Sequence, residues 1–144
     1  MIKYSDTKLI GVDLGGTKVN VGLIKGAKVL DKVSAKLPDI HLDEWCVINL
    51  IINLIKKVKR KNIIEGICIG VPSIVDKKAG IVHEVQNIST WEEVPIVSIL
   101  HNEFNQPPVF IDNDANCFVL GEYYFGSGKD HKNIVGITLG TGLG

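Results

Sequence analysis

The sequence has no excess of charge of either sign. Sixteen Lys and Arg residues balance sixteen Asp and Glu residues, and the formal net charge at pH 7 is zero. Proteins that bind nucleic acid usually carry a basic patch and a positive excess. The balance therefore argues against a nucleic-acid partner.

Long apolar runs are also missing. The N-terminus lacks the apolar stretch of a secretory signal. The most apolar segment, residues 45–58, is interrupted by Asn49, Asn53, Lys56 and Lys57. A segment this polar does not cross a membrane, so we expect no membrane partner.

Cysteine is scarce. The three cysteines are Cys46, Cys68 and Cys117, and no two of them form a CxxC pair. Such a set predicts reduced, buried thiols in a cytoplasmic protein and no zinc in this chain. The four histidines are scattered along the sequence, and we assign them no catalytic or metal-binding role.

What the sequence does contain is a regular order of apolar segments. Period-2 patterns joined by tight turns predict an antiparallel meander of strands at residues 8–13, 18–25 and 28–37. Helical patterns follow at residues 42–61, 96–104 and 112–125. They alternate with strand patterns at residues 63–71, 109–111 and 133–139. A short hairpin is expected near Gly80.

This order of elements predicts the fold class. The continuous apolar run at residues 63–71 is typical of a central strand that is covered on both faces. A meander followed by helix–strand units predicts an α/β fold with a mixed sheet and helices on the sheet faces. It is the order of the ribonuclease H-like lobe of actin-type ATPases.

A glycine-rich turn follows the first predicted strand. Asp13 ends the strand, and Gly15 and Gly16 turn the chain back at once. Glycine lets the backbone come close to a ligand, so this turn, with Thr17 and Lys18, can bind a phosphate. The Asp13 carboxylate can hold a hydrated magnesium ion. An ordinary hairpin turn with a solvated Asp13 is the alternative.

A second glycine-rich turn follows the last predicted strand. Gly140, Thr141 and Gly142 repeat the pattern of an apolar strand followed by a Gly-Thr turn. Neither turn has the GxxxxGK[ST] pattern of a Walker loop, and neither has GxGxxG opening a helix in a βαβ unit. Two such turns predict two arms that hold one polyphosphate.

Five segments, in order along the chain, resemble the ROK (repressor, open reading frame, kinase) family of sugar kinases and sugar-responsive repressors. They are Asp-Leu-Gly-Gly-Thr-Lys at 13–18, Gly-Val-Pro-Ser-Ile-Val-Asp at 70–76, Asn-Ile-Ser-Thr-Trp at 87–91, Asp-Asn-Asp-Ala-Asn with a following Gly-Glu at 112–122, and Gly-Thr-Gly-Leu-Gly at 140–144. The first and last resemble the family's two phosphate loops. The resemblance implies ATP- and Mg²⁺-dependent phosphorylation of a sugar hydroxyl, usually the 6-position of a hexose.

The resemblance also implies roles for individual residues. Asp114 is implied as the general base that takes the proton of the sugar hydroxyl, and Asn87 and Asn113 are implied to lie near the sugar. Ser73 stands where the family often has glycine, and it either contacts the sugar or turns the chain.

Two of these positions have a structural alternative. Asp114 follows a buried strand at its C-terminal end, where ligands gather in open α/β sheets, but an Asp there also suits the cap of the next helix. For Asp112 the capping role is the better assignment. Trp91 stacks on a sugar ring or anchors a buried loop.

Later segments of the family are absent from these 144 residues. They are a sugar-binding Glu-x-Gly-His segment, a cysteine-rich zinc motif and the adenosine-binding helices. We therefore expect residues 1–144 to be the N-terminal lobe of a sugar kinase, inactive alone, with exposed apolar surface that favours homo-oligomers.

Two other functions remain open. The first is the sugar-sensing core of a ROK-type transcriptional regulator without its DNA-binding domain. Only twelve residues precede Asp13, too few for such a domain, and the two intact loops favour the kinase. The second is a small domain that binds a phosphate compound without chemistry.

Overall fold

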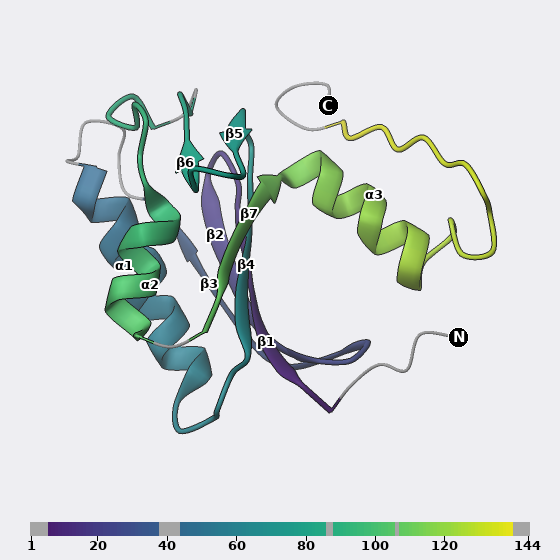
Figure 1. Ribbon diagram of the computed structural model, residues 1–144, viewed down its shortest axis with the longest axis horizontal. Helices are drawn as coiled ribbons and strands as arrows, with labels where there is room; N and C mark the ends of the chain where they lie inside the picture. The colour runs from purple at the N-terminus through teal and green to yellow at the C-terminus, as the bar shows by residue number, and fades with distance from the viewer. Residues whose placement is uncertain (1–5, 38–43, 86–87, 106, 140–144) are drawn as a thin grey trace.

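Five strands form a mixed sheet at the centre of the molecule. They are β1 (Lys8–Leu14), β2 (Lys18–Lys25), β3 (Lys28–Lys36), β4 (Gly66–Val71) and β7 (Val109–Asn113). The computed structural model describes residues 6–37, 44–85, 88–105 and 107–139. The strand order is β3-β2-β1-β4-β7 (Figure 1). The first three strands form the predicted antiparallel meander, and β4 and β7 extend the sheet parallel to β1.

Two helices cover one face of this sheet. α1 (Glu44–Lys59) and α2 (Ile96–Phe104) lie together on that side (Figure 1). Because side chains alternate along a strand and repeat every 3.6 residues along a helix, each element has one apolar face to bury. The core contains Ile10, Val12 and Leu14 of β1, Val19 and Val21 of β2, and Ile48, Ile51 and Ile55 of α1. No helix in the described ranges is long and apolar enough to cross a lipid bilayer.

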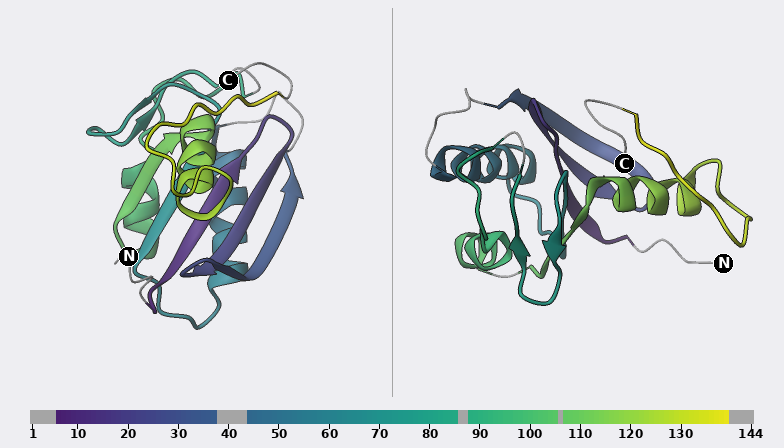
Figure 2. Two further views of the ribbon diagram at one scale, coloured as in Figure 1. Left: turned by 90° about the vertical axis from the view of Figure 1, so that its right-hand side faces the viewer. Right: turned by 90° about the horizontal axis from the view of Figure 1, so that it is seen from above.

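The opposite face of the sheet is only partly covered. α3 (Asp114–Phe125) lies on this side, against β4 and β7 (Figures 1 and 2), and none of its residues is buried. Cys68 on β4 is exposed, and Phe110 on β7 is 60% exposed. The prediction that residues 63–71 are covered on both faces therefore fails at Cys68, although Gly66 and Gly70 on the same face of β4 are buried. β4 turns Ile67 and Ile69 toward the core and turns small residues toward the open face.

A small hairpin connects β4 to α2. It consists of β5 (Val75–Asp76) and β6 (Ile81–Val82), and it confirms the hairpin predicted near Gly80. Gly80 has a φ of +73°, and a Cβ at this position would lie 2.6 Å from the Cβ of Val97. Glycine is therefore required here both by the backbone conformation and by the space.

The strand predicted at residues 133–139 does not form within the described part of the chain, so that prediction is wrong. The segment runs as an extended chain beside α3 (Figure 2), and Val135 is 92% and Leu139 is 84% exposed. An alternating apolar pattern favours a strand, but a strand also needs a neighbour that pairs with its backbone groups. In the described part of the chain, residues 133–138 have no such pairing, and Leu139 alone is in an isolated bridge.

Candidate functional site at the carboxyl edge of the sheet

A row of polar side chains crosses the sheet near its carboxyl edge. The strand register aligns Asp13 of β1 with Gly70 of β4, and Gly70 with Asp112 of β7. On the other side, Asp13 is opposite Asn20 of β2, and Asn20 is opposite Ser34 of β3. The carboxyl ends of parallel strands are where open α/β sheets bind ligands. The register thus brings Asp13 and Asp112, 99 positions apart in the sequence, to the same edge.

Asp13 is held by a chain of two hydrogen bonds. Asn20 Nδ2 donates to Asp13 Oδ2 at 2.9 Å, and Ser34 Oγ donates to Asn20 Oδ1 at 2.6 Å. Because the hydroxyl of Ser34 occupies the amide oxygen, the amide nitrogen is directed at Asp13. One carboxylate oxygen of Asp13 is fixed in this way, and the exposed side chain can present the other to a ligand.

The predicted phosphate turn joins β1 to β2. The Gly15 amide donates to the Lys18 carbonyl at 2.9 Å, which closes the turn, and the Leu37 amide donates to the Thr17 carbonyl at 2.9 Å. The backbone amides of Gly16 and Thr17 make no hydrogen bond to the described residues. Two successive free amides form a concavity suited to an anion.

The charge beside this turn also suits an anion. Exposed Lys18 on β2 lies directly opposite exposed Lys36 on β3. Like charges in directly opposed positions destabilise a sheet, so a bound phosphate between the two ammonium groups would relieve their repulsion.

The first turn of α3 carries the candidate base. Asn113 is the cap of the helix, since its Oδ1 accepts hydrogen bonds from the Ala115 amide at 3.0 Å and the Asn116 amide at 3.3 Å. The assignment of Asp112 as the cap is therefore wrong, because Asp112 continues β7 and its carboxylate faces other partners. Asp114 is half-buried and accepts one bond at Oδ1, from the Ala115 amide at 2.8 Å.

Asp112 makes more hydrogen bonds than any predicted site carboxylate. Its Oδ2 accepts from Lys77 Nζ at 2.5 Å, and its Oδ1 accepts from Asn116 Nδ2 at 2.9 Å and from the Asn113 amide at 2.8 Å. Partial burial alone would raise the pKa of this carboxyl. The hydrogen bonds from Lys77, Asn116 and Asn113, with the charge of Lys77, outweigh that effect and hold the pKa below its usual range.

Ser73 links the loop after β4 to the cap of α3. Its carbonyl accepts a bond from Asn113 Nδ2 at 3.2 Å. Its hydroxyl donates to the carbonyls of Ile74 and Glu84, so in this state the hydroxyl turns and holds the chain. The backbone of Ser73 therefore orients the amide of Asn113.

Asp13 and Asp114 line one hollow of about 500 Å³ on the open face of the sheet. Gly70 lies between them on β4, where a Cβ would be 3.5 Å from the Cα of Asp114 and 3.4 Å from Cys117 Sγ. These are ordinary van der Waals distances, so the start of α3 lies in contact range of β4 at Gly70. The wall of the hollow also includes Gly11, Gly22, Cys68 and Phe118.

The two thiols in this hollow are not the buried thiols that the sequence predicts. Cys68 and Cys117 are exposed, and Cys46 is half-buried. Desolvation by the walls of the hollow nevertheless raises the pKa of Cys68 and of Cys117. Nearby Asp112, Cys68 and Asp114 raise the pKa of Cys117 further. Both thiols are therefore protonated near neutral pH and are poor nucleophiles.

Several predicted residues lie elsewhere. Trp91 is 1% exposed, which assigns it to the buried loop anchor and not to a stacking surface. Asn87, Gly140, Thr141 and Gly142 are outside the described residues. Among the described residues, no group of three or more His, Cys, Asp or Glu side chains is placed to hold a metal ion.

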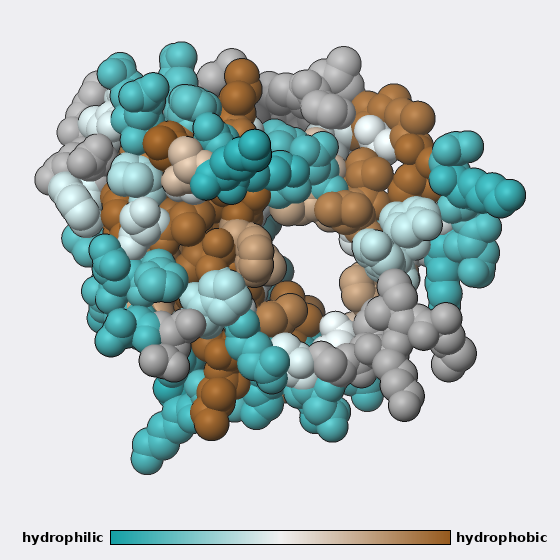
Figure 3. All heavy atoms as spheres, viewed as in Figure 1, coloured by the Kyte–Doolittle hydropathy of each residue, from teal (hydrophilic) through white to brown (hydrophobic). Residues whose placement is uncertain are grey.

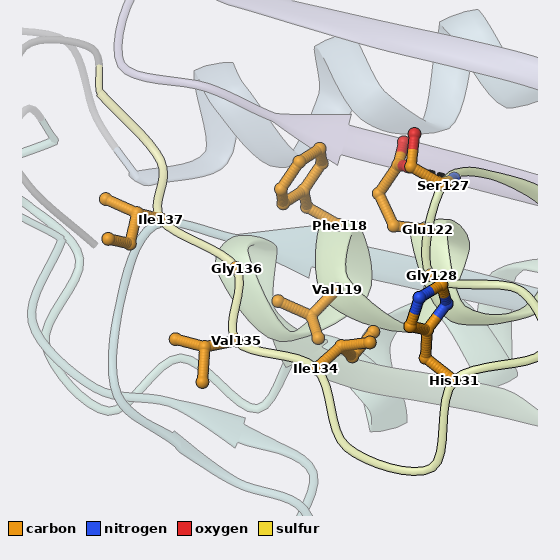
Figure 4. A pocket seen from close by; sticks show the side chains of 10 residues that line it. All are labelled: Phe118, Val119, Glu122, Ser127, Gly128, His131, Ile134, Val135, Gly136 and Ile137. Carbon is orange, nitrogen blue, oxygen red and sulfur yellow. Dashed lines mark hydrogen bonds between the residues drawn. The ribbon is translucent and has the colours of Figure 1, made fainter.

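A second hollow of about 390 Å³ lies between α3 and residues 127–137 (Figure 4). None of the described site residues predicted from the sequence lines it. Figure 4 shows apolar side chains such as Val119 and Ile134 on its walls, with Glu122 and His131 at one end.

Four functional candidates were missed from the sequence. Asn20 and Ser34 become recognisable only when the register of β1, β2 and β3 is known. Lys77 is 35 residues from its partner Asp112, so nothing local relates the two. Asn116 offered a signal, since it follows Asp112 by one helical turn.

A mixed sheet of this order, with a glycine turn after β1 and a carboxylate at the start of α3, has the ribonuclease H-like, actin-type ATPase fold. The chain belongs to the ROK family, whose model matches residues 9–144.

Individual relatives agree with this membership. The chain is 41% identical over 138 residues to a glucokinase of Thermotoga maritima, covering 95% of this chain and 43% of the relative. It is 35% identical to a xylose repressor of Caldicellulosiruptor bescii, covering 94% and 35% of the two chains. Its structure matches a ROK family glucokinase from Streptomyces griseus, solved with glucose and AMPPNP, with a TM-score of 0.85, 32% identity and coverage of 95% and 43%. The chain thus spans less than half the length of these proteins.

Proposed function

We propose that this chain is the N-terminal lobe of a longer ATP-dependent sugar kinase, which phosphorylates the 6-hydroxyl of a hexose or N-acetylhexosamine. One observation carries the proposal. Asp13 and Asp114 line the same hollow at the carboxyl edge of the sheet, one just before the glycine turn and the other at the start of α3. Because Asn113 caps the helix, the carboxylate of Asp114 is available for chemistry.

In the proposed reaction, Asp114 is the general base. A carboxylate oxygen of Asp114 takes the proton of the sugar hydroxyl as the hydroxyl oxygen forms its bond to the γ-phosphorus of ATP. The bond from that phosphorus to the bridging oxygen breaks, and ADP leaves. Asn113 and Asn87 would orient the sugar, and Ser73 holds Asn113 through its carbonyl.

The phosphates would lie over the turn after β1. The amides of Gly16 and Thr17, the closed turn at Gly15, and the ammonium group of Lys18 form this arm. The turn containing Gly140, Thr141 and Gly142 is proposed as the second arm.

Asp13 fits a magnesium ion. Its carboxylate is a hard oxygen donor, and Asn20 holds one of its two oxygens while the other remains available. Mg²⁺ prefers one or two carboxylates, several waters and substrate phosphates over a cage of protein ligands. When bound with ATP, Mg²⁺ neutralises part of the charge of the phosphates. Asp13 would position the hydrated magnesium ion.

The rest of the longer protein would supply the other lobe. Closing of two lobes over substrates assembles such sites and excludes water, so the present chain alone is proposed to lack turnover. Free Cys46, Cys68 and Cys117 suit the reducing environment of the cytoplasm, where we place the protein.

The test is release of ADP by the full-length protein with ATP, Mg²⁺ and a panel of sugars. The panel contains glucose, mannose, N-acetylglucosamine, N-acetylmannosamine and xylose. We expect at least one hexose or N-acetylhexosamine to stimulate ADP release well above the sugar-free rate. Absence of stimulation by every sugar would refute the kinase.

The second candidate is the sugar-sensing core of a transcriptional regulator. The observation in its favour is the similarity to a xylose repressor. This function needs sugar binding without phosphoryl transfer, so calorimetric binding of a sugar with no ADP release would support it. The presence of Asp114 and of the intact turn after β1 favours the kinase.

A further inference from the structure

Lys77 reaches the candidate site from outside it. It lies in the turn of the β5–β6 hairpin, where Asp76 Oδ1 accepts hydrogen bonds from the Lys78 amide at 2.8 Å and the Ala79 amide at 2.9 Å. These bonds fix the turn from which the Lys77 side chain extends. Its Nζ lies 2.5 Å from Asp112 Oδ2, at the end of β7.

Asp112 connects Lys77 to the start of α3. Its other oxygen, Oδ1, accepts hydrogen bonds from the Asn113 amide and from the side chain of Asn116. Asp114 and Ala115 are the two residues between these anchors. One carboxylate therefore joins the hairpin, the end of β7 and the first turn of α3.

Lys77 lies among groups that are negative or neutral. Asp112 and Asp114 both lie close enough to Cys117 to act on its thiol, so two carboxylates share this corner with two neutral thiols, Cys68 and Cys117. Lys77 is the cation that these groups face among the described residues. Without Lys77, Asp112 Oδ2 would lose its hydrogen-bond donor, and the bonds from Asn113 and Asn116 to Oδ1 would hold the carboxylate alone.

We infer that Lys77 is a positioning residue, which fixes the first turn of α3, and with it Asp114, through Asp112. Its effect on turnover rests on the function proposed above, whereas its effect on the helix start does not.

A purely stabilising role would look different. The side chain of Lys77 is 57% exposed and that of Asp112 is 20% exposed. Exposed ion pairs contribute little to global stability, so a variant without the ammonium group should remain folded. The effect is expected at the helix start and at the site beside it.

The first test measures amide hydrogen exchange by NMR in the 144-residue chain. Lys77→Met removes the charge and keeps most of the side-chain length. We expect exchange at the amides of Asn113 and Asn116 to become roughly fivefold faster, as loss of about one hydrogen bond predicts. Exchange in α2 should not change. The matched control is Lys78→Met, which removes a neighbouring exposed lysine of the same turn.

The second test measures turnover of the full-length protein. Lys77→Met should lower kcat roughly 10- to 100-fold, as expected for a misplaced catalytic group, with the KM for ATP little changed. Lys77→Arg should restore most of the rate, and Lys78→Met should behave like the unmodified protein.

The outcomes separate this inference from the proposed function. Faster exchange with an unchanged kcat would show a structural contact only and would overturn the positioning role, as would unchanged exchange. If the unmodified protein phosphorylates no sugar, the proposed function fails, and the exchange comparison alone decides whether Lys77 orders the helix start.

Discussion

The side chain of Asn20 donates a hydrogen bond of 2.9 Å to the carboxylate of Asp13, its direct neighbour across the β1–β2 pair. Ser34 completes the chain from the next strand. The orientation of the proposed magnesium-binding carboxylate is therefore set by two residues of the meander, which is rigidly hydrogen-bonded and covered by α1.

Replacing Asn20 by Asp should weaken binding of MgATP. The change removes the amide donor and places a second carboxylate beside Asp13, so the two repel and compete for protons. We expect a loss of roughly tenfold in affinity for MgATP, with sugar affinity unchanged. Calorimetric titration of the full-length protein with each ligand measures both. Ser34→Ala, which removes only the support for the amide, should lose less; equal losses in the two variants would argue against the chain of bonds.

Replacing Asp114 by Ala should lower turnover far more than sugar binding. Loss of a positioned base typically lowers kcat by roughly 10²- to 10⁴-fold. The measurement is the steady-state rate of ADP release beside a separate sugar titration. Glu65→Ala, at an exposed carboxylate just before β4 and therefore at the opposite end of that strand from the site, is the control. A kcat near that of the unmodified protein would exclude Asp114 as the base.

Replacing Gly16 by Val should weaken ATP binding far more than sugar binding. The branched side chain would stand beside the free amides of the turn and obstruct the approach of a phosphate. Separate titrations with ATP and with sugar measure the two effects. Equal losses of both affinities would indicate misfolding and not a blocked phosphate turn.

Replacing Gly80 or Gly121 by alanine should change the free energy of unfolding in opposite directions. Gly80→Ala should lower the free energy of unfolding by about 2 kcal/mol or more, because the position has a φ of +73° and the new Cβ would meet Val97. Gly121→Ala, inside α3, meets no atom within 4 Å, so it should raise the free energy by roughly 0.5–1 kcal/mol through helix propensity. Urea unfolding of the 144-residue chain, followed by tryptophan fluorescence, checks both. A neutral Gly80→Ala would contradict the packing of the hairpin on α2.

Acid should remove the contribution that the ionised side chain of Asp112 makes to the free energy of unfolding. Its pKa is lowered in the folded state, so the unfolded chain takes up this proton first as the pH falls. The stabilisation is therefore complete above the unfolded pKa of about 4, and it is lost as the pH falls through the lower folded pKa. Asp112→Asn should show a smaller drop in urea midpoint between pH 6 and pH 2.5 than the unmodified chain. An equal drop in the two proteins would show that folding does not lower the pKa of Asp112.

Much of the fold could be predicted from the sequence because its elements carry strong local patterns. β2 and α2 have the predicted bounds, since alternating or helically spaced apolar residues are bordered there by turn residues. Residues 133–139 carry the same alternating pattern and yet form no strand within the described chain. A local pattern does not tell whether a pairing partner is present.

The candidate site, like the fold, could be predicted from the sequence only in part. Asp13, Asn113 and Asp114 stand at strand ends, and the sequence alone marks those ends. The partners Asn20, Ser34 and Lys77 become visible only through strand register and through the fold of the hairpin. The assignment of Asp112 as a helix cap failed because the cap is Asn113, one position later than expected, and the helix begins at Asp114.

The outermost strand of the meander has a consequence for handling the protein. β3 forms one edge of the sheet, and it carries three exposed lysines, Lys28, Lys32 and Lys36. Edge strands with regularly spaced lysines resist the addition of a strand from another molecule. Any clustering of concentrated samples should therefore begin at the exposed aromatic side chains of α3, which are Phe118, Tyr123, Tyr124 and Phe125. Such clustering should give soluble, reversible oligomers. Fibrils that grow from the edge of the sheet are not expected.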